Sequence, residues 1–180
     1  MTKSKIILLA APAPRDNPPI LYVGVRTDLS TMGRGKALAQ ACHVGSLFAR
    51  DHMILVERAG KKVDPLVESW FDSESNPTSP LGFGITLTID LPDLNTMTAL
   101  VETASMLDFK AGLLVDPSYP FIIANELVSR LDSSKFTLPP QSVSPTETVC
   151  FVEETTMCYI FGRKADLAIL LGRYKLVPND

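Results

Sequence analysis

The sequence has few of the features that define disulfide-rich, zinc-binding or membrane proteins. Its three cysteines, Cys42, Cys150 and Cys158, are an odd number for a disulfide framework and lack the spacing of metal ligands. No stretch approaches the roughly 20 consecutive apolar residues that span a bilayer. We therefore expect no metal, no membrane association and a reducing, cytoplasmic compartment.

An excess of positive charge is also missing. The chain has 17 lysines and arginines against 20 aspartates and glutamates, and its net charge is -3. Domains that coat nucleic acid by bulk electrostatics are usually basic. The balance argues against such a protein and leaves a local basic site open.

The first residues weakly resemble a signal peptide, because Lys3 and Lys5 precede an apolar run. That run is about six residues long, shorter than the roughly 7–15 residues of a signal core. We therefore expect a protein that is not secreted.

The composition is that of one globular domain. The chain has 180 residues, of which 46% are hydrophobic and 21% charged, a size and balance suited to a single core. Residues 1–19 are rich in proline near their end and are expected to form an N-terminal arm. The domain proper is expected to cover residues 20–180.

Hydrophobic patterning predicts an α/β fold. Apolar and β-branched runs predict strands over residues 20–25, 84–90, 111–115 and 146–152. Helices are predicted over 36–49, 63–71, 93–107, 121–131 and 164–171, with irregular segments over 72–80 and 132–145. A strand-helix-strand unit of this length favours a parallel crossover. We therefore predict a mixed, mainly parallel sheet of about four strands with helices on both faces.

Three polar residues of the first predicted helix share one face. Lys36, Gln40 and His43 are spaced i, i+4, i+7, and the helix follows a strand and a glycine-bearing turn. The free N–H groups of its first turn, with Arg34 and Lys36, suit a phosphate or an oxyanion. The same pattern fits a solvated face, and a lone histidine is often structural.

Two aspartates follow predicted strands. Asp116 ends the strand over 111–115, and ligand sites of α/β proteins form at the carboxyl ends of strands. It also fits a turn residue before Pro117. Asp28 ends the first strand, where it could serve the site, cap the glycine turn or pair with Lys36 or Arg26.

Residues 25–43, VRTDLSTMGRGKALAQACH, resemble the N-terminal signature of the type 2 peptidyl-tRNA hydrolases. That family has a strand ending in R-(T/N)-D-L, then M-G-K-G-K, then a helix with A-x-Q and a histidine. This chain has one added residue between Leu29 and Met32, and Arg34 in place of the first lysine. The resemblance continues more weakly through residues 97–107, 111–116 and 171–176.

The resemblance implies hydrolysis of the ester between peptide and tRNA, without metal or cofactor, by a protein that forms homodimers. Asp116 would position or deprotonate water, and Lys36 would stabilise an oxyanion or a phosphate. The implied catalytic residues are Lys36, Asp116, His43 and Gln40. The implied substrate-binding residues are Arg26, Asp28, Arg34 and Ser118.

The chain departs from the family pattern after Asp116. The family continues A-G-R-T-Q, whereas residues 117–121 read PSYPF, which places Pro120 at the position of the family threonine. Proline has neither a hydroxyl nor an N–H. Three hypotheses follow: a hydrolase in which Ser118 replaces the threonine hydroxyl, a weak or inactive relative that binds tRNA or another ligand, and an enzyme for another small ester or amide.

Overall fold

The computed structural model describes residues 17–71, 84–174 and 176. The predicted N-terminal arm and the loop over 72–80 therefore lie largely or wholly outside the described residues. The strands are β1 (Pro19–Arg26), β2 (Ile85–Leu91), β3 (Lys110–Ala124), β4 (Phe136–Ser142) and β5 (Glu147–Arg163). The main helices are α1 (Arg34–Ala49), α3 (Pro65–Phe71), α4 (Leu94–Met106) and α6 (Lys164–Leu171). No helix in the described residues is long and apolar enough to cross a membrane.

All five strands form one sheet, so the prediction of a single-sheet α/β fold is confirmed. The strand order is β2-β1-β5-β3, and β4 also pairs with β5. The prediction of a mainly parallel sheet is wrong. Among the strands of the described residues, only β1 and β2 pair in parallel, because β5 runs through the middle of the sheet and pairs antiparallel with β1, β3 and β4.

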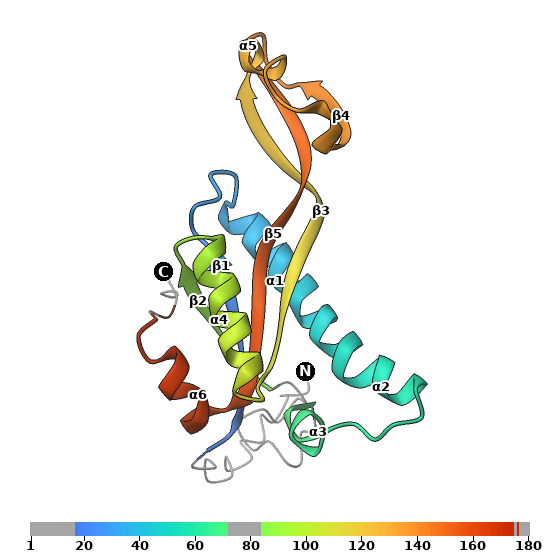
Figure 1. The fold of residues 1–180 in the computed structure, drawn as a ribbon, viewed down its shortest axis with the longest axis vertical. Coiled ribbons are helices and arrows are strands. Elements are labelled where there is room, and N and C mark those ends of the chain that lie inside the picture. Colours follow the sequence, from blue (N-terminus) through green and yellow to red (C-terminus); the bar gives the residue numbers. More distant parts are fainter. Residues whose placement is uncertain (1–16, 72–83, 175, 177–180) are drawn as a thin grey trace, which may run out of the picture.

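Helices cover both faces of the sheet, as predicted (Figure 1). On one face, Val44 and Phe48 of α1 and Val67 of α3 pack with buried residues of β1 and β5. On the other face, α4 and α6 cover β2 and β5 through residues such as Leu100 and Leu167. Full burial of a side chain of this size contributes about 1.5–3 kcal/mol. The first cluster holds α1 against the sheet, and the second holds α4 and α6 on the opposite face.

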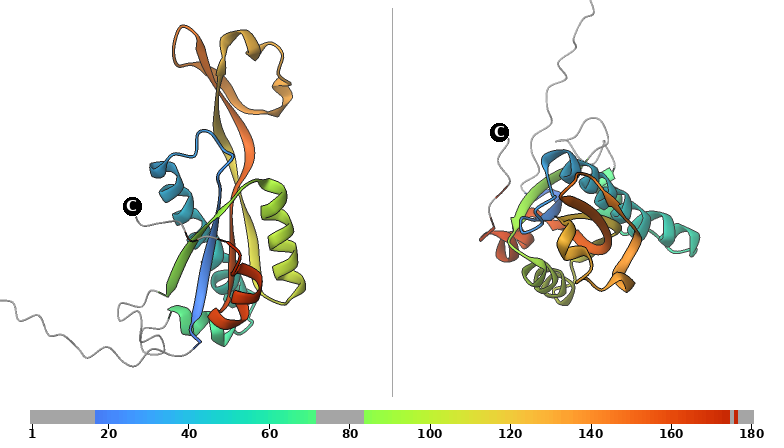
Figure 2. Two further views of the ribbon diagram at one scale, coloured as in Figure 1. Left: turned by 90° about the vertical axis from the view of Figure 1, so that its left-hand side faces the viewer. Right: turned by 90° about the horizontal axis from the view of Figure 1, so that it is seen from above.

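The sheet continues beyond the body of the protein as a narrow hairpin extension, residues 117–152 (Figures 1 and 2). There β5 pairs with β3 along one edge and with β4 along the other. The predicted helix over 121–131 is wrong, because only α5 (Asn125–Val128) is helical. The predicted irregular segment over 132–145 contains β4, whose Pro139 and Pro140 fit an edge strand since proline cannot donate to a neighbour.

A π-helical turn, η1 (Arg50–Ile54), links α1 to the short helix α2 (Leu55–Arg58). It carries His52, whose Nε2 lies 2.9 Å from the hydroxyl of buried Tyr159. Burial, followed by the positive charge of Lys110, lowers the pKa of His52, while Asp51 and Asp64 oppose the shift. The folded protein therefore favours neutral His52.

This histidine should make stability depend on pH. The pKa of His52 is lower in the folded state than the ordinary value of about 6.5. Its contribution to the free energy of unfolding is therefore complete above about pH 6.5, and it is lost as the pH falls through the folded-state pKa. Urea unfolding at several pH values should show this loss in the wild type. His52→Gln should weaken the pH dependence, whereas the matched control at the exposed histidine, His43→Gln, should retain it. Equal slopes in both variants would contradict this prediction.

Candidate active site

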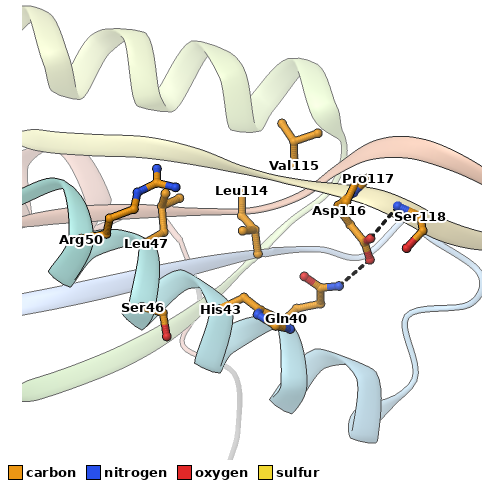
Figure 3. Close-up of a pocket in the computed structure, with 10 residues that line it drawn as sticks. All are labelled: Gln40, His43, Ser46, Leu47, Arg50, Leu114, Val115, Asp116, Pro117 and Ser118. Atoms are coloured by element: carbon orange, nitrogen blue, oxygen red, sulfur yellow. Dashed lines mark hydrogen bonds between the residues drawn. The ribbon is translucent and has the colours of Figure 1, made fainter. Parts of the chain in front are cut away.

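A cleft of about 490 Å³ lies between α1 and β3, at the base of the hairpin extension (Figure 3). One wall comes from α1 and the start of η1, and the other from five consecutive residues of β3. Its lining residues are Gln40, His43, Ser46, Leu47, Arg50, Leu114, Val115, Asp116, Pro117 and Ser118. The cleft therefore gathers four of the eight residues predicted from the sequence.

Asp116 lies where the pairing of β3 with β5 is irregular. The register shifts between Leu114 and Val115 and again between Asp116 and Tyr119. Irregularities of this kind re-aim side chains and often occur beside active sites. Here Asp116 faces Gln40 of α1 across the cleft (Figure 3).

The Asp116 carboxylate accepts two hydrogen bonds from the protein. Gln40 Nε2 donates to Oδ2 at 2.6 Å, and the backbone N–H of Ser118 donates to Oδ1 at 2.9 Å. An ionised carboxylate has about four acceptor sites, so both oxygens keep capacity for a further donor such as water. The carboxylate is held in a fixed orientation and can still bind water.

Gln40 is 7% exposed and links the two walls of the cleft. Its amide nitrogen must face Asp116, because a carboxylate only accepts hydrogen bonds. Its amide oxygen is 3.4 Å from the hydroxyl of Thr156, a fully buried residue of β5. Gln40 therefore orients Asp116, and Thr156 of β5 holds Gln40 in place.

Lys36 lies against the ring of Tyr119, with Nζ 3.6 Å from the ring centroid. The Nζ atom has almost no contact with solvent, and it has no hydrogen-bond partner among the described residues. Desolvation lowers the pKa of Lys36, and the Asp116 carboxylate opposes this shift. Asp116 therefore acts electrostatically on Lys36 at the base of the extension.

The remaining predicted residues of α1 and β3 differ in exposure. His43 is exposed and lines the cleft one turn beyond Gln40. Ser118 lines the same cleft beside Asp116. Arg34 is exposed at the first residue of α1, whose N-cap, Gly33, provides no side-chain hydrogen bond. An arginine and uncapped N–H groups therefore lie together at this helix start.

Arg26 and Asp28 form part of an internal ion-pair network. The Arg26 guanidinium binds both Asp28 carboxylate oxygens, at 2.9 and 2.7 Å, and also binds Glu154 and the Thr155 carbonyl. Arg26 is 7% exposed. The hydrogen bond from Arg26 is the main cause of the lowered pKa of Asp28. Of the roles expected for Asp28, the structure shows the pairing with Arg26. Arg26 would have to leave its partners to bind tRNA.

This network should contribute to stability. Arg26→Met removes the guanidinium and leaves Glu154 and a backbone carbonyl without their donor. Because the carboxylates are partly exposed, we expect a loss of about 2 kcal/mol in the free energy of unfolding, below the full cost of breaking a buried pair. The matched control is Arg50→Met, which removes the exposed pair with Asp51 and should leave the free energy of unfolding almost unchanged. Similar losses in the two variants, measured by urea unfolding, would contradict this assignment.

Tyr119, Thr31 and Glu154 were not predicted from the sequence. Tyr119 and Glu154 contact the predicted Lys36 and Arg26, and Thr31 is bonded to Tyr119. The sequence carries a partial indication of Tyr119, because this residue lies three positions after Asp116 in a segment that continues as β3. Pro117 favoured the opposite prediction, that the strand ends at Asp116.

The chemistry available at the cleft is that of acid-base and electrostatic catalysis. Asp116 can accept a proton from a bound water. Lys36 is not among the residues that line the cleft, and its positive charge lies close enough to interact electrostatically with Asp116. Within residues 17–71, 84–174 and 176, no group of three or more histidine, cysteine, aspartate or glutamate side chains could hold a metal ion. The described side chains thus offer a base and a cation on facing elements.

No protein-family model matches this chain, and no curated protein matches it.

Proposed function

We propose that the protein hydrolyses the ester bond between peptide and tRNA, with the cleft between α1 and β3 as its active site. The observation that carries the proposal is the contact between Gln40 and Asp116, with the Asp116 carboxylate close enough to act electrostatically on the buried Lys36 ammonium. These residues come from the segments whose sequence resembles the type 2 peptidyl-tRNA hydrolases. The resemblance suggests the substrate and the roles of the residues, and the hydrogen bonds of Asp116 support its proposed role.

The reaction is acyl transfer to water. Asp116 positions a water molecule and accepts its proton as the water attacks the ester carbonyl, while Gln40 and the Ser118 N–H keep the carboxylate oriented. Lys36 stabilises the oxyanion that forms on the carbonyl oxygen. The ester bond to the tRNA 3′ oxygen then breaks, and that oxygen takes the proton that Asp116 had accepted, which restores the carboxylate.

The tRNA would be bound by local charge, since the chain as a whole is acidic. Arg34 and the uncapped first turn of α1 provide donors for phosphate at the start of the helix. Exposed His43 lies on the same helix and would help to orient the substrate. Binding should therefore weaken as salt concentration rises.

A second candidate is a relative that binds tRNA without cleaving it. Two observations favour it: the Lys36 ammonium is shielded by Tyr119, and Pro120 occupies the position of the family threonine. In this case the cleft would hold the tRNA 3′ end, and Asp116 would have no catalytic role.

One pair of assays separates these candidates. Cleavage of an ester-linked N-acetylaminoacyl-tRNA is measured under single-turnover conditions, and binding is measured with the amide-linked analogue that resists hydrolysis. Hydrolysis of the ester together with binding of the amide supports the proposed enzyme. Binding of the amide without hydrolysis supports the second candidate, and failure to bind either ligand contradicts both.

A further inference from the structure

Tyr119 is a fully buried residue of β3, and its ring forms the surface against which Lys36 rests. The lysine Nζ lies 3.6 Å from the ring centroid, well within the roughly 6 Å over which the face of an aromatic ring attracts a cation. The ring follows the second register shift of β3 directly. The irregularity that places Asp116 in the cleft therefore also places Tyr119 beneath Lys36.

The ring contact replaces part of what Lys36 loses on leaving water. An ammonium carries three donors, and Lys36 Nζ has no hydrogen-bond partner within the described residues. The interactions that remain are the negative face of the ring and the field of Asp116. A cation desolvated in this way responds strongly to any change in the ring beneath it.

The position of the ring is itself fixed by Thr31, in the loop between β1 and α1. Thr31 Oγ1 lies 2.7 Å from the Tyr119 hydroxyl and 2.9 Å from the Pro120 carbonyl oxygen. A carbonyl only accepts, and a threonine hydroxyl has one proton, so Thr31 can donate to Pro120 while accepting from Tyr119. The ring is thereby tied to the loop that leads into α1, the helix that carries Lys36.

We propose that Tyr119 is a positioning residue that holds the Lys36 ammonium beside Asp116, with Thr31 locking the ring in place. The lysine is kept near the carboxylate without forming the direct ion pair that would occupy both groups. Arg26, Glu154 and Asp116 are the charged groups that influence the Tyr119 hydroxyl, and Asp116 is the one that influences Lys36. The catalytic consequence of this arrangement rests on the proposed function, but the positioning does not.

The positioning can be tested by NMR without any activity. In protein labelled with ¹³C-lysine, the Lys36 ε-methylene signal is identified by its disappearance in Lys36→Met. In the wild type and in Tyr119→Phe, the ring should shift this signal upfield, and the pKa of Lys36 should lie below its ordinary value. In Tyr119→Leu the upfield shift should be lost, and the pKa of Lys36 should return toward its ordinary value because the ammonium is no longer held and moves into water. The matched control is Tyr174→Leu, which removes the cation–π pair with Arg173 and should leave Lys36 unchanged.

A Lys36 pKa that stays lowered in Tyr119→Leu would show that the ammonium keeps its place without the ring and would overturn the proposal. If Tyr119→Leu fails to fold, Thr31→Val serves instead, because it keeps the ring and removes its tether. This variant should reduce the upfield shift, and an unchanged signal would contradict the role of Thr31.

The catalytic consequence has a separate readout. On N-acetylaminoacyl-tRNA, Tyr119→Leu should lower kcat on the order of 10²-fold with little change in KM, because the cation is misplaced while tRNA contacts remain. Tyr119→Phe should restore most of kcat. A wild type that cleaves no substrate would contradict the proposed function. The NMR experiment would still test whether Tyr119 positions Lys36. An active wild type whose kcat survives Tyr119→Leu would overturn the catalytic consequence.

Discussion

Replacing Lys36 with methionine is expected to lower kcat/KM for cleavage of peptidyl-tRNA by about 10²–10³-fold, the loss typical of removing one oxyanion donor. Stability should be unchanged or slightly higher. The ammonium has no hydrogen-bond partner in the described residues, so its removal leaves no group unsatisfied, and methionine can keep the apolar contact with Tyr119. Urea unfolding and single-turnover cleavage measure the two properties separately.

The matched control is Lys62→Met, which removes an exposed lysine away from the cleft and should change neither property. Full activity of Lys36→Met would show that Lys36 contributes nothing to catalysis. Loss of activity that follows the loss of folded protein would make Lys36 a structural residue instead.

Asp116→Asn should lower kcat by about 10²–10⁴-fold, the usual contribution of a general base. The shape of the side chain is retained, but an asparagine has one acceptor oxygen where the carboxylate has two. Gln40 Nε2 and the Ser118 N–H would then compete for it, and we expect a loss of stability of about 1–3 kcal/mol.

Asp108→Asn is the matched control, because Asp108 is exposed just before β3 begins, whereas Asp116 lies within that strand. Its φ of 63° is in the left-handed region, which asparagine adopts readily. This variant should retain both activity and stability. An Asp116→Asn protein with wild-type kcat would contradict the role of Asp116 as the base.

The sequence predicted local elements well where one short segment carried the signal. The run before Arg26 and the helix formers after Gly33 predicted β1 and α1, and α1 begins at Arg34. The apolar spacing of residues 93–107 predicted α4, whose N-cap is Asp93. In each case helix propensity, capping or burial on one element decides the outcome.

The prediction failed where pairing between distant segments decides the structure. The sequence predicts that a strand ends before Pro117 and that Pro139 and Pro140 lie in an irregular segment, yet β3 passes through Pro117 and β4 contains the other two. An irregular register and an edge strand accommodate these prolines, and both depend on β5, which is distant in sequence from Pro117. The hairpin extension was therefore not recognised.

In the candidate site too, local features were predicted and contacts between distant segments were not. The spacing of Lys36, Gln40 and His43 placed them on one helix face, and Asp116 was expected at a strand end. The contact between Gln40 and Asp116 brings these two elements together. The contact of Lys36 with Tyr119 could not be predicted, because it requires the register shift in β3 that turns Tyr119 inward.

The most direct test of the central claim is the rate at which the purified full chain releases N-acetylated amino acid from ester-linked tRNA. The same measurement on a Lys36→Met, Asp116→Asn double variant, prepared identically, controls for contaminating hydrolases. The proposed function predicts cleavage by the wild type and a rate at the uncatalysed background for the double variant. Background cleavage by the wild type, or equal rates for the two proteins, would contradict it.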